Sequence, residues 1–167
     1  VTAKRHSDNK TGQLNKKLKV IKISNNENNW IADLEKVDVI ISCLASRTGE
    51  PEDAHLVDYK LNCLLLEKAK ALKCSQFILL SAICVQKPRL AFQFEKLAFE
   101  EELKKSGLNF SIVRPTAYFK SLSGQIENIK KGKPYVYFGD GQITRCNPIS
   151  EKDLSLYIPV SYTHLRA

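Results

Sequence analysis

The sequence predicts an α/β fold in which a doubly wound parallel sheet is covered by helices on both faces. Three short, continuous apolar runs, Val37–Leu44, Phe77–Ala82 and Phe110–Val113, have the length and composition of strands that are buried on both faces. Amphipathic helical patterns lie between these runs. Strands that alternate with helices in this way are typical of βαβ units, which build parallel sheets.

Two further strands are expected near the start of the chain. Val1–Lys4 is predicted to be the end of an extended segment. Leu18–Ser24 alternates apolar and polar residues and is followed by the polar run Asn25–Asn29, which has the composition of a loop. The order of elements therefore begins with two strands that precede the three apolar runs.

Three helices are expected in the remainder of the chain. Asp53–Leu72 repeats apolar residues at steps of three and four, and Leu90–Lys105 has a looser apolar stripe that Gly107 ends. Ser150-Glu-Lys-Asp153 reads as a capping box that opens a helix to about Ile158.

The pattern changes after Pro115. Tyr135–Phe138 and Ile143–Cys146 flank Gly139-Asp140-Gly141, a combination that predicts a hairpin. We therefore expect a small hairpin-and-helix appendage on the α/β core, which together occupy residues 1–159. The last eight residues, 160–167, read VSYTHLRA, which matches a translated sequencing adaptor. We treat this tail as non-native and exclude it from the fold.

Composition and charge narrow the functional classes. The formal net charge is 26 − 18 = +8, but the basic residues are spread from Lys4 to Arg166 without an aromatic-rich platform. We expect no nucleic-acid partner, and local basic residues suit an anionic cofactor or substrate. None of the five cysteines forms a C-x-x-C pair, and the three histidines stand alone. We therefore expect no metal site and read the cysteines, Cys43 and Cys84 included, as reduced thiols that pack in the core.

Polar residues follow the predicted strands at the points where they end. The segments are Lys4-Arg5-His6, Ala45-Ser46-Arg47, Ser81-Ala82-Ile83 and Arg114–Phe119. Because open parallel sheets bind ligands at the carboxyl ends of their strands, these four loops are expected to meet at one edge and form the site.

Several short motifs follow the order of one large superfamily. Phe92-Gln93-Phe94-Glu95-Lys96 is spaced like a Tyr-x-x-x-Lys pair, with phenylalanine in place of the tyrosine, and Ser81 stands at a strand end before it. These features resemble the short-chain dehydrogenase/reductase superfamily in its extended and atypical branches. The other matching positions are Asp58-Tyr59, Asn62, Glu67–Lys70, Arg114-Pro115, Gly141 and Ile149–Leu154.

Four longer stretches, Ser42–Arg47, Leu79–Pro88, Ile112–Leu122 and Gly132–Gly141, match a narrower family in order and spacing. They resemble the plant-type divinyl chlorophyllide 8-vinyl reductases of the NmrA-like branch. The resemblance implies a Rossmann-like NAD(P)-binding domain over residues 1–159, NADPH as the cofactor and a tetrapyrrole as the substrate. The implied reaction reduces the 8-vinyl group of divinyl chlorophyllide or protochlorophyllide to ethyl during chlorophyll synthesis.

The resemblance also implies what this chain lacks. We expect a first strand and its glycine-rich, phosphate-binding turn to lie upstream of Val1, and a further portion to follow the C-terminus. In such a sheet the first strand lies between Val1–Lys4 and Val37–Leu44. Without it, either the strands at Val1–Lys4 and Val37–Leu44 join directly, or the N-terminal strands stay loosely attached while the three apolar strands form a parallel core in neighbour order. We expect the second outcome, because these three strands keep their own crossover helices and bury the most apolar surface. Arg47, Ser81 and Thr116 should then lie along one edge, and the chain alone is expected to be inactive.

The resemblance assigns catalytic roles to Lys96 and Ser81, which are also expected to contact the cofactor. Lys96 would bind the nicotinamide ribose, or it is an ordinary exposed helix lysine. We expect Lys96→Ala to reduce turnover or cofactor affinity without unfolding the protein, because an exposed lysine tip adds little to the core. Ser81 would contact the cofactor or only cap a strand end.

Further residues are expected to bind the cofactor or the substrate. Arg5 and Lys4 would meet the 2′-phosphate of NADPH, or they belong to a solvated loop. The other expected cofactor-binding residues are Cys43, Leu44, Ala45, Pro115 and Thr116. Lys87, Tyr118 and Phe119 are expected to bind the substrate. The alternative for Lys87 is an exposed loop lysine, and the alternative for the two aromatic residues is packing against the hairpin.

Two rival functions stay open at the level of sequence. One is an atypical short-chain reductase of the same branch, isoflavone-type or epimerase-like, with another substrate. The other is a non-catalytic, NADP-sensing regulator that resembles NmrA, because Phe92 cannot deliver a proton as tyrosine does. The location is a plastid if the source is an alga or a plant and the cytoplasm if it is a photosynthetic bacterium. Peripheral association with plastid membranes and the oligomeric state stay open.

Overall fold

The computed structural model describes residues 2–4, 20–22, 36–136, 140 and 147–163, and the chain divides into two units, Val1–Val37 and Asp38–Ala167. In the first unit, β1 (Thr2–Lys4) pairs in parallel with β2 (Val20–Lys22), with Thr2 opposite Val20. Both strands lie within segments that the sequence predicts to be extended.

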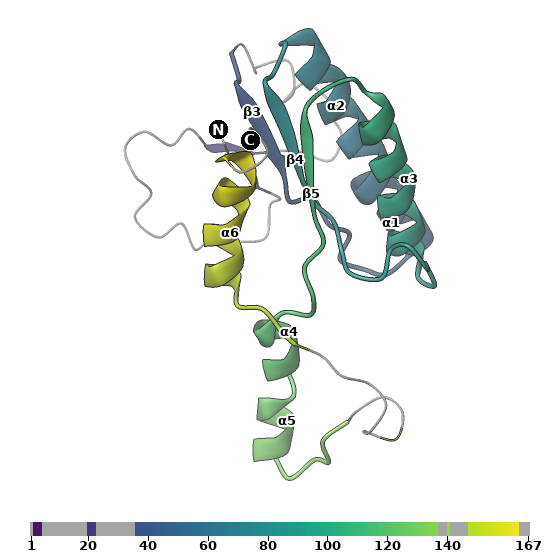
Figure 1. Cartoon of the computed structure of the whole chain (residues 1–167). Helices are drawn as coiled ribbons and strands as arrows, with labels where there is room; N and C mark the ends of the chain where they lie inside the picture. Colours follow the sequence, from purple (N-terminus) through teal and green to yellow (C-terminus); the bar gives the residue numbers. More distant parts are fainter. Residues whose placement is uncertain (1, 5–19, 23–35, 137–139, 141–146, 164–167) are drawn as a thin grey trace. The chain divides into compact units, whose positions relative to one another are not determined.

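The second unit is built on a parallel sheet of three strands (Figure 1). Its strands are β3 (Val39–Ser42), β4 (Gln76–Leu80) and β5 (Phe110–Val113), in the order β3-β4-β5. Ile40 pairs with Phe77, which also pairs with Phe110. The predicted three-stranded core in neighbour order is therefore confirmed, and β1 and β3 belong to separate sheets.

The crossover between β3 and β4 is one continuous helical segment with an irregular centre. It consists of α1 (Pro51–Ala54), the π-helical turn η2 (His55–Lys60) and α2 (Leu61–Ala71). It covers the helix expected over Asp53–Leu72 and begins two residues earlier, because Pro51 stands at the first helical position, where its missing N–H costs nothing. A π-helical turn inside an α-helix is frequently found at functional sites.

The second crossover contains α3 (Ala91–Lys105), which begins after Leu90 and is followed by Gly107 in a left-handed conformation (φ +76°). Figure 1 shows α2 and α3 on one face of the sheet and α6 (Glu151–Thr163) on the other. On the α3 face Phe77 packs against Phe99 with ring centroids 5.8 Å apart, and both are wholly buried. On the α6 face Leu154 packs with Ile78 and Val113. Helices on both faces of the sheet are thus confirmed.

The chain beyond β5 differs from the prediction. Two short helices, α4 (Phe119–Ser123) and α5 (Ile126–Lys130), lie where no helix was expected. The predicted hairpin falls mostly on residues 137–139 and 141–146, which lie outside the described residues. The chain returns to the core through a bridge between Tyr118 and Ile149.

The last helix begins where the capping box predicts, because the Asp153 N–H donates to Ser150 Oγ at 3.0 Å. It contains Pro159 and ends at Thr163, past the expected end near Ile158. The helix therefore includes residues 160–163, the first residues of the tail that is expected to be non-native. Among the described residues, no helix has the length and apolarity needed to cross a membrane.

Candidate functional site

The loops that follow β3, β4 and β5 share one edge of the sheet, because the three strands are parallel. The backbone continues to pair beyond the strands: the Ser81 N–H donates to Val113 O at 2.7 Å and the Ile83 N–H to Pro115 O at 3.0 Å. The loops after β4 and β5 are thereby held side by side. Polar side chains from α3 and η2 reach the same edge.

Lys96 is the centre of one buried network. Its Nζ lies 2.9 Å from Asp58 Oδ1 and donates to the carbonyl oxygen of Leu44 at 3.1 Å. The Lys96 side chain is only 6% exposed and Asp58 is wholly buried. The expectation of an exposed lysine tip is therefore wrong, because the ammonium of Lys96 pairs with a carboxylate that is itself wholly buried.

Asp58 connects this network to the loop after β3. Its Oδ2 accepts a hydrogen bond from the Ser46 N–H at 3.2 Å. Asp58 belongs to the π-helical turn η2, and Asn62 in the next turn donates from Nδ2 to Asp58 O at 3.0 Å. Asn62 Oδ1 accepts from Ser42 Oγ at the end of β3. The turn, the lysine and the loop 43–46 therefore form one connected unit.

Glu100 is the centre of a second buried network on the same helix. It follows Lys96 by one helical turn and is wholly buried. Ser81 Oγ donates to Glu100 Oε1 at 2.6 Å. Arg114 donates to the same oxygen from Nε at 3.1 Å and to Oε2 from Nη2. The hydrogen bond with Glu100 raises the pKa of the Arg114 guanidinium, and the two side chains form an ion pair at this end of the site.

Asp58 and Glu100 are functional candidates that the sequence reasoning missed. In the sequence, Asp58 is only part of a family match, and Glu100 has no compositional feature that separates it from its glutamate neighbours. Glu100 is the first residue of the run Glu100-Glu101-Glu102, which has the composition of a solvated helix face. In the structure Glu101 and Glu102 are exposed as expected, whereas Glu100 is buried. A glutamate one turn beyond the family lysine is the signal that could have identified it.

The residues expected to contact the cofactor lie in different surroundings. Leu44 and Ala45 lie in the loop held by Lys96 and Asp58, and Thr116 Oγ1 donates to Asn147 O beside β5. Cys43 and Cys84 are exposed, which corrects the expectation that they pack in the core. Although Cys43 is exposed as a residue, nearby protein atoms partly desolvate its thiol and raise the pKa, and the positive charge of Lys96 opposes that shift.

The residues expected to bind phosphate, Lys4 and Arg5, belong to the first unit. Lys4 ends β1, and Arg5 lies outside the described residues. Among the described residues, no group of three histidine, cysteine, aspartate or glutamate side chains could hold a metal ion.

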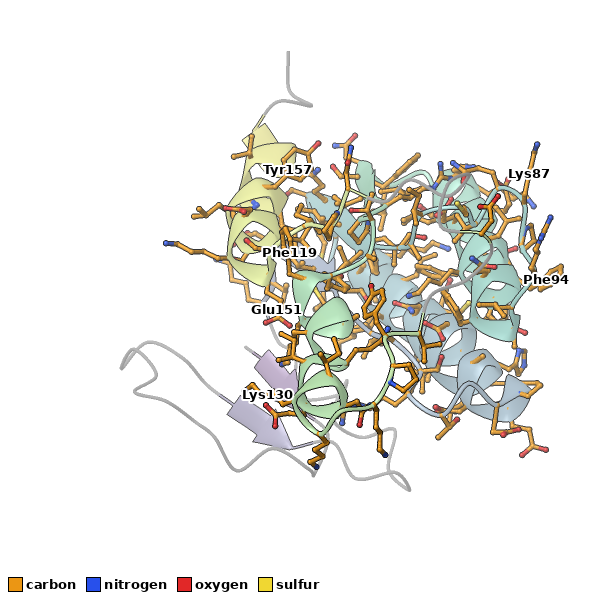
Figure 2. All side chains as sticks on the ribbon, turned by 90° about the horizontal axis from the view of Figure 1, so that it is seen from below. Lys87, Phe94, Phe119, Lys130, Glu151 and Tyr157 are labelled. Carbon is orange, nitrogen blue, oxygen red and sulfur yellow. The ribbon has the colours of Figure 1, made fainter. Side chains whose placement is uncertain are left out.

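The three expected substrate residues are not brought together. Figure 2 shows Lys87 and Phe94 on one side of the unit and Phe119 with Glu151 on the other. Tyr118 packs against the cluster of Ile78, Val113 and Leu154, and Phe119 is 56% exposed. The packing alternative therefore describes Tyr118 in this structure.

The donor set at the sheet edge fits a dinucleotide. An ammonium has three donors, and within the part of the chain that the structure describes Lys96 contacts two partners, Asp58 and Leu44 O. One N–H is left for a sugar hydroxyl at the carboxyl end of β3, where open parallel sheets bind nucleotides. A parallel sheet with helices on both faces and polar groups at this edge defines the class of Rossmann-like nucleotide-binding domains.

The chain belongs to the NAD(P)H-binding family, whose model matches residues 1–147. It is 53% identical over 134 residues to divinyl chlorophyllide a 8-vinyl-reductase, chloroplastic, from Cucumis sativus, covering 77% of this chain and 32% of that protein. The enzyme of the same name from Arabidopsis thaliana is 53% identical over 128 residues, covering 73% of this chain and 31% of that protein. The resemblance to this narrower family is confirmed, and the chain spans about a third of the length of these relatives.

A solved structure confirms the fold class independently. MoeE5 in complex with UDP-glucose and NAD superposes with a TM-score of 0.70 at 15% identity, over 85% of this chain and 58% of that one. At this identity the likeness concerns the fold alone.

Proposed function

We propose that the protein containing this chain is an NADPH-dependent reductase that converts the 8-vinyl group of divinyl chlorophyllide to ethyl. The observation that carries the proposal is the 53% identity over 134 residues to a chloroplastic reductase named for this substrate. The sheet edge, with its buried Lys96–Asp58 pair, supports a dinucleotide site in the same chain. The chloroplastic names of the relatives also support a plastid location for this protein.

The described residues account for binding and orientation in such a reaction. NADPH, when bound, would supply the hydride for one vinyl carbon, and the other carbon would take up a proton. Lys96 donates its remaining N–H to a ribose hydroxyl, and Asp58 holds the ammonium in place. Phe92 has no dissociable proton, which suits a C=C bond because its reduction produces no alkoxide. The proposed substrate contacts of Lys87 and Phe119 would be made from separate sides of the unit.

The proposal predicts turnover of a defined substrate. The complete gene product that contains this chain should oxidise NADPH only when divinyl chlorophyllide is present. The Soret band of the pigment should move to shorter wavelength, because one conjugated vinyl group is lost. Monovinyl chlorophyllide is the matched control and should give no oxidation. Tight binding of NADP⁺ without turnover of any tetrapyrrole would contradict the proposal and favour an NADP-sensing regulator.

The preference for NADPH over NADH is proposed to depend on Arg5, which follows β1 in the sequence. Arg5→Ala should weaken NADPH binding by about five- to a hundredfold and leave NADH binding unchanged, since only NADPH has the 2′-phosphate that the guanidinium would meet. Titration calorimetry with both cofactors measures the two constants. Lys152→Ala, which removes an exposed charge on α6, is the control and should affect neither. Equal losses for both cofactors would refute the role of Arg5.

A further inference from the structure

We propose that Glu100 is a positioning residue that fixes the direction of the Ser81 hydroxyl, so that Ser81 accepts a hydrogen bond from the nicotinamide carboxamide of the bound cofactor. The inference rests on the cofactor that the proposed function assigns. It adds Glu100 to the residues of the site and states that Ser81 acts as a hydrogen-bond acceptor. It also predicts that Ser81 does not supply the proton of the reduction.

The hydrogen bonds around Glu100 leave Ser81 one orientation. Arg114 has only donors and occupies both carboxyl oxygens, so Glu100 acts as an ionised acceptor on both of them. Ser81 Oγ lies 2.6 Å from Glu100 Oε1, and an acceptor-only carboxylate can receive only the hydrogen of the hydroxyl. The single hydrogen of Ser81 is therefore directed at Glu100, and only lone pairs are left on Oγ.

Because its hydrogen is already donated to Glu100, the Ser81 hydroxyl can bind only a group that donates a hydrogen bond to it. The nicotinamide ring of NADPH has one group with N–H donors, its carboxamide, and this group is complementary to the lone pairs of Ser81. A proton transfer from Ser81 to a vinyl carbon would require the hydrogen to leave Glu100 first. The arrangement therefore favours cofactor binding by Ser81 over the catalytic role that the sequence resemblance implies.

The position of Glu100 on α3 supports this reading. Lys96 and Glu100 are one turn apart on a helix that lies against the sheet, and each contacts the loop after a different strand. Lys96 presents a donor beside the loop after β3, whereas Glu100 turns Ser81 into an acceptor after β4. Residues of one helix thereby place a hydrogen-bond donor at one point of the sheet edge and an acceptor at another.

Glu100→Gln tests the direction of the hydroxyl without changing the shape of the side chain. Glutamine has one oxygen in place of the two that Arg114 and Ser81 share. When that oxygen replaces Oε2 and accepts from Arg114 Nη2, the amide N–H replaces Oε1, faces Ser81 and reverses the hydroxyl. The dissociation constant of NADP⁺, measured by calorimetry on the complete gene product, should rise about five- to tenfold. Ser81→Ala should give a similar rise, and the double variant should be no weaker than the poorer single variant, because both changes remove one interaction.

The control variant is Gln76→Met. Gln76 Nε2 donates to Ser111 Oγ in another buried polar pair, at the amino end of β4, away from the proposed site. This change should lower the thermal midpoint while leaving NADP⁺ affinity unchanged. Additive losses of affinity in the Glu100→Gln, Ser81→Ala double variant would overturn the proposal, since they would mean that Glu100 acts by general destabilisation.

A cofactor analogue gives a test that does not require Glu100→Gln to fold. In the 3-acetylpyridine analogue of NADP⁺ a methyl group replaces the carboxamide nitrogen, so the donor is absent. Ser81→Ala should weaken NADP⁺ but leave the affinity for the analogue unchanged. Equal weakening of both would overturn the proposal. Neither binding experiment contains chlorophyllide, so a protein that shows these affinities without turnover would contradict the proposed reductase and leave the assignment of Glu100 standing.

Discussion

Replacement of Lys96 by alanine is expected to lower the free energy of unfolding by about 3–5 kcal/mol, because it leaves the wholly buried carboxylate of Asp58 without its cation. Urea unfolding followed by circular dichroism measures the change. The matched control is Lys104→Ala on the same helix, whose ammonium pairs with Glu101 in a half-exposed contact. This surface pair should contribute less than about 1 kcal/mol.

A second variant separates charge from packing at this position. In Lys96→Met with Asp58→Asn, the neutral amide needs no cation, and its oxygen can still accept from the Ser46 N–H. We expect the double variant to recover most of the stability lost in Lys96→Ala. If Lys96→Ala proves as mild as Lys104→Ala, the buried ion pair is not what holds η2 against α3.

Phe99→Ala is expected to destabilise the protein by about 3–5 kcal/mol, the range for removing a large aromatic ring from a packed core. Phe99 is wholly buried and packs against Phe77, so the ring fixes the distance between α3 and the sheet. Phe94, on the same helix, is 54% exposed, and Phe94→Ala should cost less than about 1 kcal/mol. The two variants are compared by their midpoints in urea at equal slope.

Phe99→Ala also has a consequence for the site. Lys96 and Glu100 flank Phe99 in sequence, so a shift of α3 would move both buried charges. We expect NADP⁺ affinity to fall in Phe99→Ala and to stay unchanged in Phe94→Ala. Equal stability losses for the two phenylalanines would contradict the packing that the structure assigns to Phe99.

The strands were predictable because a parallel strand that is buried on both faces needs a continuous apolar run. Phe77–Ala82 is such a run, and β4 lies within it except at Gln76. The carboxyl edge followed from the topology, since parallel strands end on one side. The family was predictable because long stretches such as Leu79–Pro88 match in order and spacing, which few unrelated sequences can do.

The helices after β5 were not predictable in the same way. α4 and α5 have five residues each and lie outside the sheet, so they lack the long apolar stripe that identifies a helix in a sequence. The π-helical turn at His55–Lys60 was hidden for a different reason: its residues fit an α-helical pattern. Only the contacts of Asp58 with Lys96 and Ser46 explain why that turn holds its position.

The class of fold and the edge at which the strands end follow from the sequence alone, because they depend on hydrophobic pattern and chain direction. The order of the strands followed from the family resemblance together with the crossover helices. The sequence also determined the family, through the stretches that match. Which charged residues are buried became apparent from the three-dimensional contacts. Lys96, Glu100 and Glu101 look alike as polar positions on one helix, and burial depends on whether another element supplies an opposite charge. Asp58 and Arg114 supply those charges from other elements, η2 and the loop after β5. The local sequence pattern of α3 therefore cannot show which of its charged residues make these contacts.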